Sequence, residues 1–475
     1  MKGRFSLYKA NRLYFFLLLI IVFGIGVITG TLLYRRYYIE KMLYANPNYN
    51  PDNLPDSTSV RIDSTNLPII FINTLGKHVE RNGYITATMT IINNGKGKMN
   101  YGDTIKCTNQ VVDYKGYIAI KYRGKSSYAF APKKPYVIKT LKNSLEKGGK
   151  KKKTQLLGLR RGKKWALKAG CLEKSMIRDA LTAELAKPYK VFVPEVRFCE
   201  VVVNGIYRGV YYLSEQITAD RLNIHKPGDI GNSLTGGYLM QIDERNHGVK
   251  GNYSSKRYEH MKYLYEYPDS EKLTFNQKKY ICGVIDEMEK KVKEKDVYFA
   301  KIVDVQSMID YQLVVEFSCN VDGYKMSTFM YKFPDDIDPR IKFGVWDFDM
   351  AYGNYAGEDG GKWLYQNYES WWKDAMEIPQ YTEQVRRRWE QYRISSYSNE
   401  HIEHVIDSLA TLLTYGGAES RNADAWNIWK GKDWTGPRRF LYEKYMAVSY
   451  EEEIGYLKEC IYKRLQWMDQ ELLTR

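Results

Sequence analysis

Apolar and polar residues alternate with a period of two over much of residues 67–217, and turn-forming Gly and Asn residues separate the alternating runs. Asn204-Gly205 sits between two such runs and predicts a tight hairpin. One stretch, residues 173–187, instead has helical spacing of its apolar residues. We therefore predict a β-rich N-terminal lobe with one helix. Its expected strands cover residues 67–74, 84–92, 116–122, 135–140 and two strands within 197–217.

Beyond residue 217 the period changes to that of amphipathic helices. Ser449, with Glu452 three residues later, has the pattern of a capping box at the start of the last helix. At 475 residues the chain exceeds what one hydrophobic core supports, so a second, helical lobe spanning 218–475 is expected. The fold class is α+β in two lobes, with a ligand cleft between them. The expected helices cover residues 273–294, 304–320, 398–415 and 449–473.

Residues 14–34 carry no charged side chain and are long enough to cross a bilayer, which takes about 20 apolar residues. A cleaved signal peptide would have a shorter apolar run and a small-residue cleavage site. We expect a retained transmembrane anchor, preceded by a basic cytoplasmic tail, 1–13, and followed by a polar linker, 35–66. This topology places the two lobes outside the cytoplasm, in the periplasm or at the cell surface.

Composition and the absence of certain motifs exclude several classes of functional site. With 44% hydrophobic and 27% charged residues, the chain is typical of folded proteins. Its six cysteines lack C-x-x-C spacing, which argues against zinc-ribbon and thioredoxin-type sites. G-x-S-x-G and H-E-x-x-H are absent, so serine-hydrolase and zincin functions lack support. His401 and His404 are best interpreted as surface residues because no third metal ligand accompanies them.

The net charge of +16 is concentrated in residues 141–164, which hold ten Lys or Arg and one Glu. Such a run fits either a solvated loop between strands or a surface for nucleic acid or membrane. No aromatic residues are interleaved for base stacking, so we favour the solvated loop and expect no nucleic-acid partner.

A short cationic turn, Arg123-Gly124-Lys125-Ser126-Ser127, lies between two predicted strands. Backbone N–H groups and two cations around a glycine can hold phosphate, although the Walker pattern is absent. A plain basic hairpin explains the same residues. Lys139 ends the following strand, where a lysine can hold phosphate as a point charge.

Two acids sit at structurally informative points. Glu184 shares the apolar stripe of the helix at 173–187 and should face the protein, either toward a lysine partner or at the lobe edge. Asp322 begins an Asp-Gly turn directly after an apolar helix, which suits a catalytic base, although a simple Asx turn has the same pattern.

The segment Val345 to Asn354, VWDFDMAYGN, places Asp347 and Asp349 in an apolar and aromatic run. A strand could turn both carboxylates to solvent. If they are buried, they require a counter-charge, since an unpaired buried carboxylate costs several kcal/mol. The counter-charge is either a side chain or a metal ion, and the place of the two acids after the Asp322 turn favours a metal with Asp347 as its ligand. Asp349 is either a helper in that site or the last acid before a Gly turn.

Taken in order, these features resemble the CotH kinase family, the atypical kinases similar to spore coat protein H. The resemblance runs from about residue 67 to the C-terminus and is specific in combination. It rests on six stretches: RGKSSYAFAPKKPYVIKT, WALKAGCLEKSMIRDALTAELAK, VVVNGIYRGVYYLSEQI, GGYLMQID, NVDGYKMSTFMYK and VWDFDMAYGN.

The resemblance implies a protein-kinase-like fold, ATP and Mg²⁺ as cofactors, with Mn²⁺ as the alternative ion, and a protein substrate. It implies that Asp322 accepts the proton of the acceptor hydroxyl and that Asp347 and Asp349 bind the metal. The implied ATP and phosphate contacts are Arg123, Lys125, Ser126, Lys139, Glu184 and Glu215. Ser327 stands where the family plan has a second, Asn metal ligand, so Asp349 is expected to take over that role.

Two alternatives stand beside the kinase interpretation. ATP is scarce outside the cytoplasm, which keeps open a catalytically inactive surface or adhesion module with the same fold. Asp322 and Asp347 could also form the carboxylate pair of a carbohydrate enzyme, which would need a sugar-stacking aromatic groove.

Overall fold

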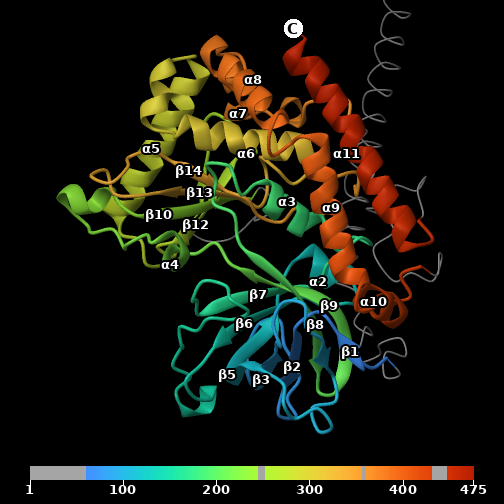
Figure 1. Ribbon diagram of the computed structural model, residues 1–475. Coiled ribbons are helices and arrows are strands. Elements are labelled where there is room, and N and C mark those ends of the chain that lie inside the picture. Colours follow the sequence, from blue (N-terminus) through green and yellow to red (C-terminus); the bar gives the residue numbers. More distant parts are fainter. Residues whose placement is uncertain (1–59, 244–251, 356–359, 430–446, 475) are drawn as a thin grey trace, which may run out of the picture. The chain divides into compact units, whose positions relative to one another are not determined.

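A computed structural model describes residues 60–243, 252–355, 360–429 and 447–474 of the chain (Figure 1). They belong to one compact unit, Pro55–Arg475. The predicted membrane anchor at 14–34, its cytoplasmic tail and the linker up to residue 59 lie outside the described residues. Within the described ranges, no helix is both long and apolar enough to cross a membrane.

Seven strands of the N-terminal part form a closed barrel, in which β2 and β8 pair in parallel and the other neighbours are antiparallel. Side chains at alternate positions fill its interior, among them Ile118, Ile138 and Trp165, which are fully buried. The barrel strands are β2 Ile69–Asn73, β3 Ile85–Ile92, β5 Val112–Tyr122, β6 Tyr136–Thr140, β7 Lys164–Lys168, β8 Val196–Val203 and β9 Ile206–Glu215. Two short strands, β1 Ser64–Thr65 and β4 Asn100–Tyr101, pair beside it.

The strands expected from alternation are confirmed, including the hairpin at Asn204-Gly205, where both residues have the positive φ of a tight turn. The expected helix is shorter than predicted: α3 covers Arg178–Leu185. Met176 interrupts the helical pattern with φ +61°, and residues 173–177 instead form a buried polar turn that holds the start of α3.

The C-terminal part contains a five-stranded sheet with the order β11-β12-β10-β13-β14. The sequence pattern predicted only one of these strands, at residues 327–333. Helices pack around this sheet (Figure 1). Its strands are β10 Tyr238–Ile242, β11 Tyr253–Ser254, β12 Lys262–Tyr267, β13 Thr328–Lys332 and β14 Lys342–Gly344. The helices are α4 Ala219–Leu222, α5 Phe275–Lys293, α6 Val305–Ser318, α7 Trp371–Ala375, α8 Pro379–Arg393, α9 Asn399–Thr414, α10 Ala418–Trp426 and α11 Tyr450–Leu473.

Helix α6 forms the centre of this part, because nearly every side chain from Ser307 to Ser318 is buried. Its polar residues are paired with buried partners; Glu316, for example, binds Arg464 of α11 at 3.0 Å. The helix ends at Cys319 in a left-handed conformation, which turns the chain sharply toward the barrel and begins the loop that carries Asp322. The chain is thus a mixed α+β protein with a β-rich N-terminal part and a helical C-terminal part.

Helix α10 binds the two parts together by packing on β9 of the barrel. Asn422 accepts hydrogen bonds from the backbone N–H of Val210, at 3.0 Å, and from the ammonium of Lys133, at 2.7 Å. Arg421 forms a two-pronged ion pair with Glu200 of β8. Helix α10 therefore supports the barrel from its outer face.

Burial lowers the pKa of Lys133 from its ordinary value of 10.5 to about 7. Between these values the unfolded chain holds a proton that the folded chain has released, so stability should rise with pH. We expect wild type to gain up to about 1.4 kcal/mol per pH unit relative to Lys133→Met between pH 7 and 10. Denaturant titrations across this range measure the difference. The exposed Lys163→Met is the control, and equal slopes in all three proteins would contradict the assignment.

Candidate active site

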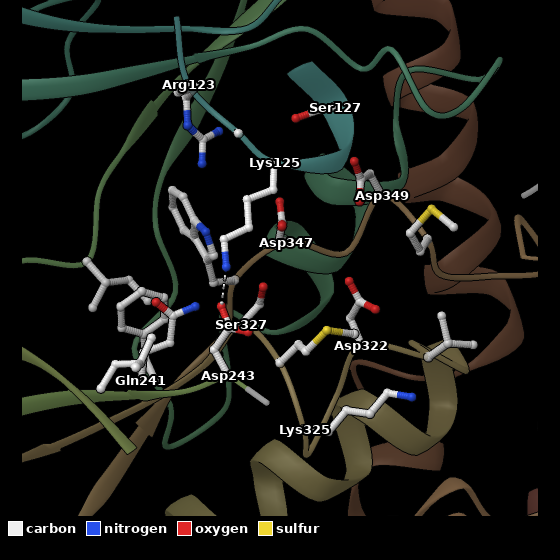
Figure 2. A pocket seen from close by; sticks show the side chains of 18 of the residues that line it. Arg123, Lys125, Ser127, Gln241, Asp243, Asp322, Lys325, Ser327, Asp347 and Asp349 are labelled. Atoms are coloured by element: carbon white, nitrogen blue, oxygen red, sulfur yellow. Dashed lines mark hydrogen bonds and ion pairs between the residues drawn. The ribbon is translucent and has the colours of Figure 1, made fainter. Parts of the chain in front are cut away.

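A cavity of about 760 Å³ opens between the barrel and the C-terminal part (Figure 2). From the barrel side it is lined by the turn at residues 123–127 and by β7. From the other side it is lined by β10, β12 and the loops that follow α6 and β14. Figure 2 shows the side chains of Asp322, Asp347 and Asp349 around this space, with Arg123 higher in the view and the side chain of Lys125 reaching past Asp347 toward Asp243.

Behind these acids, a lysine of the barrel joins two carboxylates. Side chains alternate along β7, and Lys168 lies on the side that faces away from the barrel core. Its ammonium pairs with Asp179 of α3. It also lies 3.5 Å from a carboxylate oxygen of Asp347 and over the ring of Trp346. Lys168 and Asp179 are each only 8% exposed, so their charges interact with little screening by water.

Asp179 is held on every side. It accepts hydrogen bonds from Lys168, from the hydroxyl of Tyr212 at 2.6 Å and from the backbone N–H of Phe348 at 2.7 Å. Burial alone would raise the pKa of Asp179, but the charge of Lys168 and these hydrogen bonds lower it below its ordinary value. The pair is therefore ionised, and it fixes the position of the loop that carries Asp347.

The loop at 345–350 follows β14 and is not a strand, so its acids do not alternate toward solvent. Phe348 is buried, whereas Asp347 has φ +67° and keeps 36% of its side chain exposed toward the cavity. Asp349 is half-buried nearby. Its pKa is raised well above the ordinary value by desolvation and by the charges of Asp347 and Asp179. The single positive charge of Lys168 does not balance the carboxylates of Asp179, Asp347 and Asp349. A further cation beside them would therefore be stabilised.

The Asp322 turn meets the Asp347 loop through one side chain. The amide of Asn320 donates to the backbone carbonyl of Asp347, at 3.4 Å, and accepts from the N–H of Asp322, at 3.3 Å. Gly323 is required in this turn, because a Cβ there would lie 2.4 Å from a methyl group of Val315. The loops that carry Asp322 and Asp347 are thus fixed relative to each other.

The cationic turn closes the cavity on the barrel side. Gly124 has φ +87°, and a Cβ there would lie 2.1 Å from the hydroxyl of Ser127, so only glycine fits. Lys125 reaches down to Asp243 at 3.4 Å (Figure 2). The guanidinium of Arg123 stacks 5.5 Å from the ring of Trp346. Ser127 lines the cavity, while the side chain of Ser126 lies outside the described part of the molecule.

Five predicted site residues therefore line one cavity: Arg123, Lys125, Asp322, Asp347 and Asp349. Three others lie outside its lining. Lys139 lies on the outer barrel face, 3.7 Å from the ring centroid of Tyr84. Glu184 pairs with Lys187 near the surface. Glu215 pairs with Arg221 at 2.6 Å, and its neighbour Gln216 lines the cavity instead.

The lysine–acid pair that contacts the Asp347 loop is formed by Lys168 and Asp179, whereas Lys139 contacts the ring of Tyr84 and Glu184 pairs with Lys187. The signal for Lys168 was the stretch KWALK, in which Trp165 and Leu167 alternate with outward residues next to a basic run. The signal for Asp179 was its place in the first turn of α3. Helical spacing from the buried stripe favoured Glu184, because the spacing does not show which end of the helix meets the cavity.

A second buried network fixes α3 itself. The guanidinium of Arg178, 1% exposed, binds Glu173 at 3.3 Å, Glu453 of α11 at 2.8 Å and the carbonyl of Ala351 at 3.0 Å. Arg178 and Asp179 thus bind the Asp347 loop from adjacent positions, and Glu453 ties this arrangement to the last helix.

Replacing Arg178 with Met should lower the free energy of unfolding by about 3–5 kcal/mol, because two carboxylates would remain buried without their cation. Denaturant titration measures this loss. Arg197→Met is the matched control: that arginine pairs with Glu195 at the surface, where both side chains are more than 40% exposed, and should cost under about 1 kcal/mol. Equal losses in the two variants would contradict the network.

No group of three His, Cys, Asp or Glu side chains in the described ranges already forms a metal cage. Mg²⁺ usually takes only one or two carboxylates and completes its shell with phosphate oxygens and water. Asp347 and Asp349 supply such a pair, next to the cationic turn. The donor set therefore fits Mg²⁺ carried in with a nucleotide, as opposed to an ion held by protein alone.

The comparison with protein families agrees with this geometry. The family described as CotH kinase protein matches residues 120–468, from the end of β5 into α11, so the match includes every residue lining the cavity. A search of curated proteins gives no match. The matched region covers well over half of the chain. The chain belongs to the CotH kinase family.

Proposed function

We propose that this chain is an ATP-dependent phosphotransferase that phosphorylates hydroxyl groups of proteins, with a two-lobed fold similar to that of protein kinases. The order of its elements supports the proposal: a glycine turn, the Lys168 strand, the Asp179 helix, then the Asp322 and Asp347 loops. Protein kinases use a Gly-rich loop, a strand lysine, a helix acid, a catalytic Asp and a metal-binding Asp in the same order. We place the lobes at 67–217 and 218–475.

One observation carries the proposal: Lys168 connects Asp179 of the helix and Asp347 of the loop behind a cavity that also contains Asp322. In kinases the strand lysine is active only while it is paired with the helix acid. The ion pair between Lys168 and Asp179 supports the same arrangement for this chain.

Each residue then has a defined task. Asp322 accepts the proton of the acceptor hydroxyl, and its turn orients that hydroxyl. Lys168, Lys125 and Arg123 offset the negative charge of the triphosphate, and the N–H groups of the cationic turn contact its oxygens. Asp347 and Asp349 would hold Mg²⁺, which neutralises charge on the transferred phosphoryl group when bound.

The proposal is tested by nucleotide binding. We expect MgATP to raise the melting temperature of the 475-residue chain, by mass action on the folded state, and Asp347→Asn to remove most of that rise. Thermal denaturation with ATP, with and without Mg²⁺, measures both. If neither ATP nor GTP changes the melting temperature, the inactive surface or adhesion module becomes the better assignment.

We further propose that residues 14–34 anchor the chain in a membrane, with the tail 1–13 in the cytoplasm and the kinase domain outside. The uncharged stretch and its basic flanks support this. Protease added to intact cells should digest the domain. A domain protected until the cells are lysed would reverse the topology and give the enzyme access to cytoplasmic ATP.

A further inference from the structure

Three neighbouring barrel strands and the loop beside them bring four lysines together on the outer face of the barrel. Lys139 of β6 stands directly opposite Lys164 of β7, and Lys121 of β5 lies diagonally across from Lys139. Like charges in directly opposed positions destabilise a sheet, so the arrangement has a cost. We name these residues the lysine cluster: Lys121, Lys139, Lys151 and Lys164.

Few negative charges lie close enough to offset the positive charges of the lysine cluster. No carboxylate in the described part of the chain forms an ion pair with any of its members, although the charge of Glu266 on β12 acts on Lys164. Lys121 and Lys139 share the ring of Tyr84, at 5.1 and 3.7 Å from its centroid. Burial, followed by the charges of the other three lysines, lowers the pKa of Lys139 to about 8. A bound anion would relieve this repulsion.

The cluster is continuous with the candidate active site. Lys164 lines the same cavity as Asp322 and Asp347, whereas Lys121 and Lys139 lie half-buried on the barrel face beside it. A flat membrane surface would contact the barrel face but would leave the cavity unfilled. An extended peptide can occupy both the cavity and the neighbouring face, because its side chains project separately.

We propose that the lysine cluster binds an acidic segment of the protein acceptor and so determines which hydroxyl groups are phosphorylated. This inference rests on the proposed kinase function and adds the substrate class to it. The chemistry recognised is a run of carboxylates, or of phosphoserines, close to the acceptor residue. Lysines suit such a segment because ammonium groups act as point charges and do not require one fixed geometry.

The test uses a fluorescent peptide with one Ser flanked by six Glu, and a matched peptide with Gln in place of each Glu. Without nucleotide, the 475-residue chain should bind the acidic peptide about tenfold more tightly than the neutral one, and high salt should reduce this preference. The triple variant Lys121→Gln, Lys139→Gln, Lys164→Gln should lose the preference. The control Lys96→Gln, Lys98→Gln, Lys115→Gln makes the same change in net charge at exposed lysines of β5 and of the loop after β3, and it should keep the preference.

Equal binding of the two peptides by wild type would overturn the inference, as would equal losses in both triple variants, which would show a net-charge effect only. Cluster-dependent binding to vesicles of phosphatidylglycerol, without a peptide preference, would assign the surface to a membrane and also overturn it. Because binding is measured without ATP, this failure is distinct from failure of the kinase proposal. Peptide preference without phosphoryl transfer would contradict the kinase proposal alone.

Discussion

Replacing Lys168 with Met should lower the rate of phosphoryl transfer by about 10³-fold, the upper end of the loss seen when one group that stabilises transition-state charge is removed. Lys168 is the cation that reaches both Asp179 and Asp347. Without it, the triphosphate would lose a counter-charge and Asp347 would lose its support from the barrel. The measurement is the initial rate of transfer from ATP at saturating nucleotide.

Two further variants separate this effect from loss of the fold. Lys115→Met removes an exposed lysine from the same barrel and should keep the wild-type rate to within about twofold. Asp179→Asn is close to isosteric and should reproduce most of the loss in rate, since it removes the charge that holds Lys168. If Lys168→Met kept more than about a tenth of the wild-type rate while remaining folded, the assignment of Lys168 would be wrong.

The variant Asp322→Asn should lower the turnover rate by about 10²–10⁴-fold, because a general base contributes that much to a reaction that moves a proton. The amide keeps the size of the side chain, and the turn is held by backbone contacts from Asn320 and by Gly323. The structure should therefore survive. The measurement compares kcat with the affinity for MgATP.

The pattern of losses distinguishes Asp322 from Asp347. In Asp322→Asn the affinity for MgATP should remain within about threefold of wild type, since the proposed role of Asp322 is at the acceptor hydroxyl and not at the nucleotide. In Asp347→Asn, nucleotide affinity and its dependence on Mg²⁺ should both fall. Weak MgATP binding by Asp322→Asn, with normal binding by Asp347→Asn, would exchange the two roles.

The local sequence pattern predicted most of the barrel strands, because apolar and polar side chains must alternate along a strand that has one face in a core. β3 lies where alternation placed it, β5 covers the expected 116–122 and begins four residues earlier, and the Asn204-Gly205 turn needs only its own two residues. The five-stranded sheet of the C-terminal part was missed apart from the strand at 327–333. Its strands are short or buried on both faces, and such runs do not reveal their period.

The site was predicted unevenly for a similar reason. Asp322 and Asp347 each follow a recognisable element within a few residues, and both line the cavity between the two parts. The pairing of Lys168 with Asp179 depends on how β7 and α3 meet in space, which neither segment specifies alone. Lys139 had the same local pattern as Lys168, and only the barrel order shows that it belongs to the lysine cluster.

The most direct test of the central claim is transfer of the γ-phosphate of ATP to protein. The 475-residue chain is incubated with Mg²⁺ and γ-labelled ATP, alone and with the six-Glu serine peptide, beside Asp322→Asn and Lys168→Met. We expect labelled serine or threonine in the wild-type reactions, a requirement for Mg²⁺, and at most about a hundredth of the label in either variant. Absence of label in wild type that binds MgATP, or equal label in all three proteins, would contradict the account.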